Sequence, residues 1–492
     1  MTTRPGKILG QLTPLVPLDL EAAETVSDIV AAMEQCSFGA RMLGEVAATL
    51  TSWAREKELP TVIYDGNRAS AVAGVLPKMQ YNGFVGAVLT SEAFVLRNRR
   101  TAHVLVVGHY SERHEDRLYE LATRAIFINK DNQCRPGQVR DGFFPDVVFA
   151  DPNFVMPVLN HVLLERVHSV KQTVEDLMSR LETMDGAGKE AVHGAHTLKA
   201  MLCDPDCTVF MTMSGAMTIA KMQRLPVQLI ETGRIAYLAA TGALIGHGLV
   251  EGSGCQHFKY EPRYTDEQLA KEGLNRVSDT IEPEGNFDHI EKIVRRVLQR
   301  SYPRIHRGPH ITQSSAFYRD LGAYLHRHYP DAASVLSSAY RQGVAVVTPA
   351  VVDSELANDV FVENARRGSR ARIIFDQELD TGVLFDLATK AKKLGIFTIG
   401  GGVPRNNTQN VAPLIEIYNE RLRKKLPPGR FFYGCRIDPA SMFLCHLSGC
   451  TYSEGVSWRK FDFKGMLAEV RLDATIVWPF IQKFAIGKFR QA

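Results

Sequence analysis

The chain has 492 residues, of which 45% are hydrophobic and 23% are charged. These fractions are typical of globular proteins with a packed core, and at roughly 150 residues per domain the length predicts about two to four compact units. Lysine and arginine number 58 against 54 aspartates and glutamates, so the net charge is +4. That charge is too small for a dedicated nucleic-acid-binding protein.

Membrane and secretory segments are not expected. The most apolar stretch, 149–164, is interrupted by Asp151, Pro152 and His161, among others, and is therefore a poor candidate for crossing a bilayer. The beginning of the chain contains several prolines and lacks the unbroken apolar run of a secretory signal. The eight cysteines include no CxxC pair, which favours free thiols in a reducing compartment over a disulfide framework or a metal site. We therefore expect a soluble cytoplasmic protein without a metal.

The first 203 residues are predicted to contain two kinds of structure. Apolar residues recur at helical spacing over 20–54, which predicts two short helices with a break at 38–40. Short apolar runs separated by turn residues then predict a small α/β unit, with a helical pattern at 115–124 between its strands. Its predicted strands are 61–64, 86–90, 104–107 and 146–149. Helical spacing returns over 173–202, interrupted at 185–188.

From Cys207 onward, continuous apolar strands alternate with turns and helices. This pattern predicts an α/β fold with a doubly wound, mostly parallel sheet that is covered on both faces. The predicted strands are 208–211, 235–240, 344–347, 371–375, 395–399, 431–435 and 468–472. Ligands of such sheets bind beyond the carboxyl ends of the strands, so functional residues are expected at those positions.

Two strand ends carry small residues. Gly400, Gly401 and Gly402 follow the strand at 395–399, where the absence of side chains lets backbone N–H groups approach a ligand, although a plain tight turn explains them equally well. Thr241 and Gly242 follow the strand at 235–240. That strand end indicates either a surface for the phosphate or ribose of a dinucleotide or close packing against a helix.

A third motif lies ahead of the last predicted strand, where Trp458 stands between Glu454 and Lys460. An aromatic wall beside a carboxylate suits a flexible polyamine, because the wall packs against its methylene groups and the carboxylate balances its ammonium groups. A lysine kept neutral by desolvation in such a pocket is a nucleophile able to form an imine. The alternative is a tryptophan at the edge of the core and a lysine on the surface.

The segment from Glu454 to Lys460 reads Glu-Gly-Val-Ser-Trp-Arg-Lys. It resembles the Glu-Ala-Val-Ser-Trp-Gly-Lys motif of the deoxyhypusine synthase family, which includes a bacterial deoxyhypusine synthase-like branch. Further segments that resemble the family in order are 38–44, 241–247, 348–355, 400–406 and 460–474. The resemblance covers 20–54 and 204–492, which predicts an N-terminal helical segment (1–54) and a catalytic domain (204–492) with 55–203 as an inserted α/β module and helix.

The resemblance implies a Rossmann-like tetramer that binds NAD and spermidine at subunit interfaces. In this family NAD takes hydride from spermidine, and an aminobutyl group passes through a lysine imine to a lysine of the hypusine-bearing translation factor. By resemblance Lys460 is the imine-forming nucleophile, and Glu454, Trp458, Asp353 and Asn410 bind the substrate. The cofactor-binding residues that the resemblance implies are Ser214, Thr241, Gly242, Gly401, Gly402, Asp473 and Ala474.

Three departures from the family pattern lie near these motifs. Leu447 stands where the family has an acid, Asn406 where its eukaryotic enzymes have a histidine, and Arg459 where the lysine motif has a glycine. They motivate an alternative to an active synthase, namely a weak or inactive paralogue that acts as a structural or activating subunit of a hetero-oligomer. A second alternative is a homospermidine synthase-like enzyme whose acceptor is a free amine.

Overall fold

The computed structural model describes residues 7–66, 70–97, 100–111, 114–130, 134, 145–215, 217–303, 308–440 and 450–487. The chain folds into two compact units. The first unit consists of Met1–Leu15, His196–Val470 and Lys488–Ala492, and the second of Val16–Ala195 and Arg471–Gly487. Among the described residues, no helix combines the length and apolar character needed to cross a membrane.

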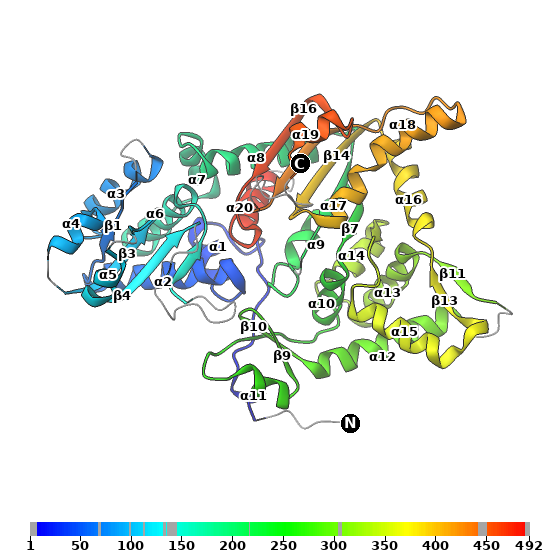
Figure 1. The fold of residues 1–492 in the computed structure, drawn as a ribbon, viewed down its shortest axis with the longest axis horizontal. Helices are drawn as coiled ribbons and strands as arrows, with labels where there is room; N and C mark the ends of the chain where they lie inside the picture. The colour runs from blue at the N-terminus through cyan, green and yellow to red at the C-terminus, as the bar shows by residue number, and fades with distance from the viewer. Residues whose placement is uncertain are drawn as a thin grey trace. The chain divides into compact units, whose positions relative to one another are not determined.

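The first unit is built on a six-stranded sheet in which every neighbouring pair of strands is parallel (Figure 1). The strands are β6 (Cys207–Met213), β7 (Ile235–Ala240), β12 (Ala345–Val347), β14 (Lys393–Ile399), β15 (Phe431–Ile437) and β16 (Phe461–Val470). Their order is β12-β7-β6-β14-β15-β16. This is the Rossmann order, because the chain adds β7 and β12 on one side of β6 and then crosses to add β14, β15 and β16 on the other. The sheet confirms the predicted α/β fold.

The strands of this sheet are apolar because both faces are covered. Phe210, Tyr237, Ile396 and Phe431 come from four different strands and belong to one buried cluster. The helices of the unit are α9 (Arg224–Glu231), α10 (Gly242–Gly252), α11 (Asp266–Lys271), α12 (Glu284–Ser301), α13 (Ser314–His328), α14 (Val335–Gln342), α15 (Glu355–Arg367), α16 (Gln377–Lys390), α17 (Gly402–Gln409), α18 (Val411–Leu422) and α19 (Tyr452–Ser457). In Figure 1, α19 lies beside β16.

Two smaller sheets complete the first unit, and one of them corrects a prediction. β8 (Phe258–Lys259), β10 (Thr280–Pro283) and β9 (Leu274–Val277) form an antiparallel sheet in that order. β11 (His310–Thr312) and β13 (Ile373–Phe375) form a parallel pair. The strand predicted at 371–375 therefore belongs outside the main sheet. Ile374 is 45% exposed, so this strand is covered less completely than the core strands.

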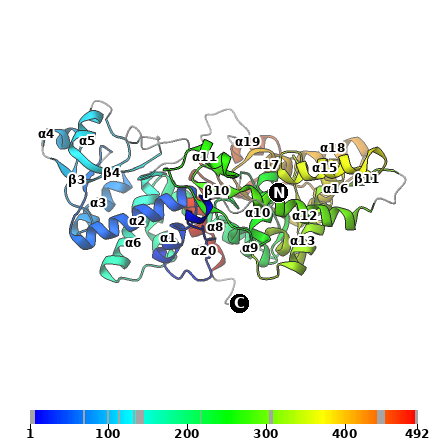
Figure 2. The same ribbon diagram turned by 90° about the horizontal axis from the view of Figure 1, so that it is seen from below.

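The second unit contains a five-stranded parallel sheet with the order β2-β1-β3-β4-β5. Its strands are β1 (Thr61–Ile63), β2 (Val88–Leu89), β3 (Thr101–Val107), β4 (Ala122–Asn129) and β5 (Val147–Phe149). Its helices are α1 (Val26–Met33), α2 (Phe38–Glu56), α3 (Ala71–Tyr81), α4 (Ser91–Leu96), α5 (Glu115–Leu121), α6 (Pro152–His168), α7 (Val174–Glu182) and α20 (Ala474–Ile486). Helix α8 (Ala187–Cys203) crosses from the second unit to the first after Ala195. Figure 2 shows α4 and α5 beside β3 and β4.

Two predictions for this region differ from the structure. The helical pattern at 115–124 ends at Leu121, and β4 begins at the next residue. The end of β4 is buried on both faces, as at Ile126 and Phe127, so it has no alternation of apolar and polar residues. The helical segment over 20–54 belongs to the second unit, where α1 and α2 pack against α6. Sequence periodicity shows that these helices have an apolar face but not which partner covers it.

Helix α20 closes the second unit with a segment from the far end of the chain. The backbone N–H of Ala40 in α2 donates a hydrogen bond to the Thr475 hydroxyl at 3.1 Å. Phe480 meets Phe154 of α6 edge to face with 5.9 Å between ring centroids. Trp478, which lies between Thr475 and Phe480 in the sequence, is fully buried. The second unit is therefore discontinuous in sequence.

Candidate functional site

The glycines after β14 lie against the end of β6 at the switch point of the six-stranded sheet. The N–H of Ser214 donates to the Ile399 carbonyl at 3.0 Å, and the Ser214 hydroxyl donates to the Gly401 carbonyl. Gly400 and Gly402 have φ angles of +74° and +59°, which glycine adopts without a steric penalty. A Cβ on Gly400 would lie 3.2 Å from the Ser214 Cβ. The turn therefore places backbone at the edge where parallel sheets bind ligands.

Thr241 and Gly242 bring the end of β7 to the same edge. The N–H of Thr241 donates to the Met213 carbonyl at 3.1 Å, and its hydroxyl donates to the Gly215 carbonyl at 2.6 Å. A Cβ on Gly242 would lie 2.3 Å from the Asp353 carbonyl oxygen. The predicted residues Ser214, Thr241, Gly242, Asp353, Gly401 and Gly402 thus lie in one neighbourhood around the ends of β6, β7 and β14.

Lys460 lies immediately before β16 and is 9% exposed. Its Nζ donates a hydrogen bond to Oδ1 of Asn406 at 3.1 Å and lies 5.9 Å from the centre of the Trp458 ring. The N–H of Lys460 donates to the Gly455 carbonyl at 3.0 Å, which fixes the backbone at the end of α19. Trp458 is 62% exposed, so its ring forms an open wall beside the amine.

Helix α17 connects the glycine turn to this lysine. Gly402 is its first residue and Asn406 comes four residues later, a rise of about 6 Å along a helix axis. Asn410 follows at the junction of α17 and α18, one turn beyond Asn406, and is exposed. The candidate cofactor turn and the candidate nucleophile therefore belong to one continuous region of the first unit.

The surroundings of Lys460 favour its neutral form. Burial lowers the pKa of its ammonium group and the cation of Arg405 lowers it further, whereas Cys450 and Glu454 raise it. Arg405 is 1% exposed, and none of its three guanidinium nitrogens has a hydrogen-bond partner among the described residues. Its Cζ lies 5.4 Å from the centre of the Tyr452 ring. A buried cation next to the lysine makes a second positive charge there costly.

Arg459, which stands where the family motif has glycine, is directed to another partner. Its φ angle is +57°, which explains why glycine suits this position. Its Nη1 forms an ion pair with Glu416 Oε2 at 2.9 Å, and the side chain is 68% exposed. The guanidinium group is therefore engaged with α18.

The remaining predicted residues lie elsewhere: two belong to the second unit, and Glu454 acts on Lys460 through its charge. Asp473 and Ala474 belong to the second unit, where Asp473 caps α20 by accepting a hydrogen bond from the Thr475 N–H at 2.7 Å. Burial raises the pKa of the Asp473 carboxyl group. Glu454 lies in the first turn of α19 and is exposed. Leu447 lies outside the described residues.

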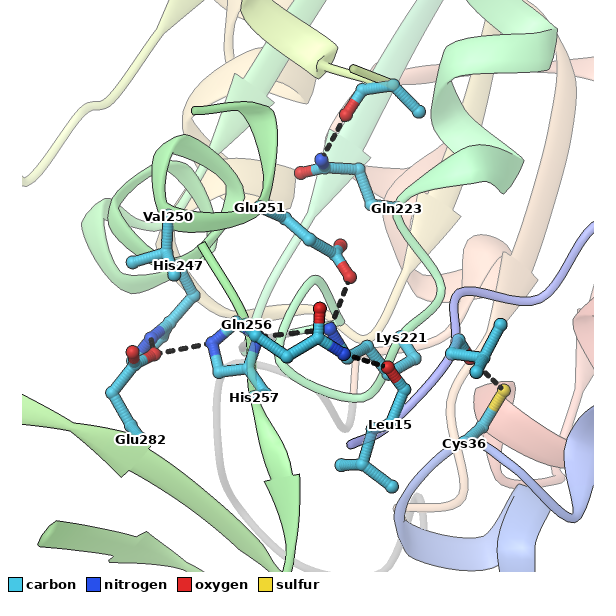
Figure 3. Close-up of polar contacts among 12 residues, drawn as sticks. Leu15, Cys36, Lys221, Gln223, His247, Val250, Glu251, Gln256, His257 and Glu282 are labelled. Carbon is cyan, nitrogen blue, oxygen red and sulfur yellow. Dashed lines mark hydrogen bonds and ion pairs between the residues drawn. The ribbon is translucent and has the colours of Figure 1, made fainter. Parts of the chain in front are cut away.

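His247, which the sequence places beside the small-residue end of β7, is buried instead in a polar network (Figure 3). Its Nδ1 lies 3.2 Å from Oε2 of Glu282 in β10, and the same oxygen pairs with His257 Nε2. Lys221 Nζ lies 3.2 Å from His257 Nδ1 and 2.6 Å from Glu251 Oε1. The network joins α10 to the antiparallel sheet.

The side chains of this network include atoms that commonly bind metal ions, but their neighbours disfavour a bound metal. Within the part of the chain that the structure describes, the donor atoms of His247, His257 and Glu282 lie within 4.8 Å of one another. A metal-bound imidazole carries a proton on its other nitrogen and donates it to an acceptor. In His257 that nitrogen faces the ammonium group of Lys221. The arrangement therefore suits a hydrogen-bonded network in which His257 accepts from Lys221 and donates to Glu282.

Sequence reasoning missed Arg405 and the role of Asn406. Both follow the three glycines closely in α17, and the sequence marks Asn406 only as a position where the eukaryotic enzymes have a histidine. The sequence signal that could have identified them is that α17 begins directly after a strand. The first turns of such a helix lie close to the edge of the sheet where ligands bind. The position of Lys460 beside this turn depends on the pairing of β15 with β16 and is not visible in the local sequence.

The sheet order and the glycine turn define a Rossmann-type α/β protein whose buried lysine precedes β16 and contacts the helix that follows the glycine turn. A family model described as deoxyhypusine synthase matches residues 176–484, and the chain belongs to that family. A Methanosarcina acetivorans protein named "Probable deoxyhypusine synthase 2" is 29% identical over 310 residues, covering 63% of this chain and 86% of the relative. A "Deoxyhypusine synthase-like protein" of Chlorobaculum tepidum is 24% identical over 328 residues, covering 66% of this chain and 89% of the relative.

Proposed function

We propose that the protein is an NAD-dependent aminobutyltransferase of deoxyhypusine synthase type, in which Lys460 carries the aminobutyl group. The observation that carries the proposal is the environment of Lys460. Its amine is buried, its pKa is lowered by burial, and it lies beside Trp458. A lysine in its neutral form is the species that attacks an imine or carbonyl carbon.

The glycine turn fits the proposed cofactor. Gly400 and Gly402 form a tight turn at the end of β14, Gly242 lets the Asp353 backbone pack closely at the end of β7, and backbone N–H groups at such an edge suit a pyrophosphate. Ser214 and Thr241 fix this edge through their hydrogen bonds to Gly401 and Gly215. NAD bound there would supply the hydride acceptor for oxidation of spermidine at a carbon next to nitrogen.

The residues around Lys460 would hold the polyamine and move protons. Trp458 would pack against its methylene groups, while Glu454 and Asp353 would balance its ammonium groups. Asn410, one turn beyond Asn406, would offer an amide oxygen. Lys460 would attack the oxidised carbon, form a C–N bond and expel the diamine part of spermidine as the leaving amine. Asn406 would orient the attacking nitrogen through its hydrogen bond at 3.1 Å.

The proposed acceptor is a lysine of the hypusine-bearing translation factor, and the proposed assembly is a tetramer, either homomeric or with a homologue. Exposed apolar side chains near Lys460 support an assembly, since Trp458 is 62% and Phe463 is 74% exposed. Native mass spectrometry of the purified protein measures the number of subunits. A monomer at micromolar concentration contradicts the proposed assembly.

The deciding experiment traps the lysine adduct. The purified protein is incubated with NAD and spermidine labelled in its aminobutyl part, reduced with borohydride, and mapped by mass spectrometry. We expect label on the peptide that contains Lys460 and none after Lys460→Ala. Lys464→Ala is the matched control, because this lysine is exposed in β16, which follows Lys460, and its loss is expected to leave labelling unchanged.

Two other outcomes separate the alternatives. Absence of an adduct from the protein alone, with labelling of a co-purified homologue that increases on mixing, contradicts the proposal and favours a subunit that activates a partner. Transfer of the label to free putrescine but not to the translation factor identifies a homospermidine synthase-like acceptor specificity.

A further inference from the structure

Arg459 directly precedes Lys460 and has a backbone conformation that disfavours any residue with a Cβ. Its φ angle is +57°. In this left-handed region the Cβ comes too close to the following carbonyl oxygen, so glycine adopts the conformation readily and other residues need contacts that hold them there. The family motif has glycine at this position, whereas this chain has arginine. The contacts that hold Arg459 therefore also determine where the backbone of Lys460 lies.

Glu416 in α18 supplies such contacts. Its Oε2 accepts a hydrogen bond from Nη1 of Arg459 at 2.9 Å, and its Oε1 accepts one from Nη2 of Arg430 at 3.0 Å. Arg430 directly precedes β15, and Arg459 is separated from β16 only by Lys460. One carboxylate thus binds an arginine ahead of each of two paired strands. We call Glu416, Arg430 and Arg459 together the Glu416 clamp.

The strand pairing beside Lys460 is separated from the rest of the ladder between β15 and β16. The N–H of Phe431 donates to the Lys460 carbonyl at 3.0 Å, and Phe431 pairs with Phe461. The register then shifts, so that the next pair is Tyr433 with Met466. Such an irregularity interrupts the hydrogen bonds of a sheet locally. The regular part of the ladder therefore begins beyond the segment that contains Lys460, and the Glu416 clamp joins the two strands on the other side of that segment.

The charge of Glu416 suits a clamp. Burial raises the pKa of its carboxyl group, but hydrogen bonds from Arg459 and Arg430 outweigh burial, so the pKa is lowered. The Glu416 side chain is 24% exposed, less than that of either arginine. A single exposed ion pair stabilises a protein little, whereas a carboxylate shared by two arginines forms a network. Loss of this one carboxylate releases both arginines at once.

We propose that Glu416 is a positioning residue for Lys460, acting through Arg459, and that it allows an arginine to stand where the family motif has glycine. The inference rests on the proposed function, because the role of Lys460 as nucleophile is what makes its position matter for the reaction. Glu416 acts through the backbone, since its two carboxylate oxygens are bound by the two arginines. The arginine at 459 is then a compensated substitution and does not by itself favour an inactive paralogue.

The first test compares the rates at which Lys460 is labelled by NAD and labelled spermidine under borohydride trapping. We expect Glu416→Gln to slow this labelling about 10-fold, since a displacement of about 1 Å at a reacting group can cost about 100-fold. Glu420→Gln is the matched control, because Glu420 is exposed one turn further along α18. Its labelling rate is expected to equal that of the wild-type protein.

Substitution of Arg459 separates positioning from a general loss of stability. Arg459→Ala removes the ion pair and keeps a Cβ at the positive φ angle, whereas Arg459→Gly removes the ion pair together with the steric cost. We therefore expect Lys460 to be labelled faster in Arg459→Gly than in Arg459→Ala. Adding Glu416→Gln to Arg459→Gly is expected to change the rate by less than about 2-fold, because the residue that needed the clamp is gone.

Hydrogen exchange without NAD or spermidine tests the Glu416 clamp independently of the reaction. Peptides that contain Phe431 are expected to exchange about 3- to 10-fold faster in Glu416→Gln than in Glu420→Gln, because the acceptor of the Phe431 N–H is held less firmly. Circular dichroism checks that each variant is folded.

The proposal is overturned if Glu416→Gln and Glu420→Gln behave alike in labelling and exchange, or if Glu416→Gln slows labelling equally with arginine and with glycine at position 459. A wild-type protein that forms no adduct contradicts the proposed function instead. In that case the exchange comparison alone decides whether Glu416 positions Lys460.

Discussion

Replacing Glu282 with glutamine measures how much the buried network around His247 and His257 stabilises the first unit. Burial acts to raise the pKa of the Glu282 carboxyl group, but hydrogen bonds from His247 and His257 lower it from 4.5 to about 2. At about 1.4 kcal/mol per pKa unit, this difference corresponds to about 3 kcal/mol of stability at neutral pH. We expect Glu282→Gln to lose approximately that amount from the free energy of unfolding.

The dependence on pH distinguishes this loss from a general packing defect. A carboxyl group whose pKa is lowered by folding contributes its full stability above its unfolded pKa of 4.5, and the contribution disappears as the pH falls toward 2. The difference between the wild-type protein and Glu282→Gln is therefore expected to shrink across that range.

Hydrogen exchange in a urea series, read on peptides from α10 and β10, reports the local free energy of opening. Glu272→Gln, which changes an exposed carboxylate at the end of α11, is the control. A loss below about 1 kcal/mol at pH 7, or a difference that stays constant down to pH 2, would refute the electrostatic reasoning.

Three further predictions concern the site and the closing helix. Arg405→Met is expected to raise the pKa of Lys460, because it removes a nearby cation, and Glu454→Gln is expected to lower it, because it removes a nearby carboxylate. The rate of Lys460 acetylation as a function of pH, followed by mass spectrometry, measures both pKa shifts, and shifts of the same sign contradict the argument. Gly242→Ala places a Cβ 2.3 Å from the Asp353 carbonyl oxygen, so it is expected to lower the free energy of unfolding by about 1–3 kcal/mol and to weaken NAD binding. A Cβ at Gly285 would have no atom within 4 Å, so Gly285→Ala is the control, and thermal unfolding with and without NAD measures both variants. Asp473→Ala is expected to lower the stability of α20 by about 1 kcal/mol because the helix loses its N-cap, and Asp473→Asn is expected to keep most of that stability. Amide hydrogen exchange in α20 measures the difference, and equally fast exchange in the two variants contradicts the capping role.

The main sheet was predictable because parallel strands covered on both faces are short, continuous apolar runs. The strands around Phe210, Tyr237 and Ile396 all carry this signal, and all three residues are buried. The signal contains no information on pairing, which is why 371–375 was assigned to the wrong sheet. It also merged α5 with the start of β4, since Ala122 continues the helical spacing that ends at Leu121.

The candidate site was predictable where it depends on strand ends and motifs. Ser214 and Gly401 follow neighbouring strands of one sheet, so their contact follows from topology alone. The burial of His247 was not predictable, because its partner Glu282 lies 35 residues away in a small antiparallel sheet that has no strong local pattern. The burial of the Arg405 guanidinium group was also not predictable, because a charged residue usually prefers the surface.

The discontinuous second unit has a consequence for the order in which the protein is made. Its closing helix, α20, is separated from the rest of that unit by the whole of residues 196–470. At a translation rate of about 5–20 residues per second, the helices that receive Thr475 and Phe480 emerge from the ribosome tens of seconds before α20 does. During that interval the apolar surface around Phe154 has no native cover from α20. The nascent chain is therefore expected to need chaperone protection at its N-terminal segment while the Rossmann-type unit is still being synthesised.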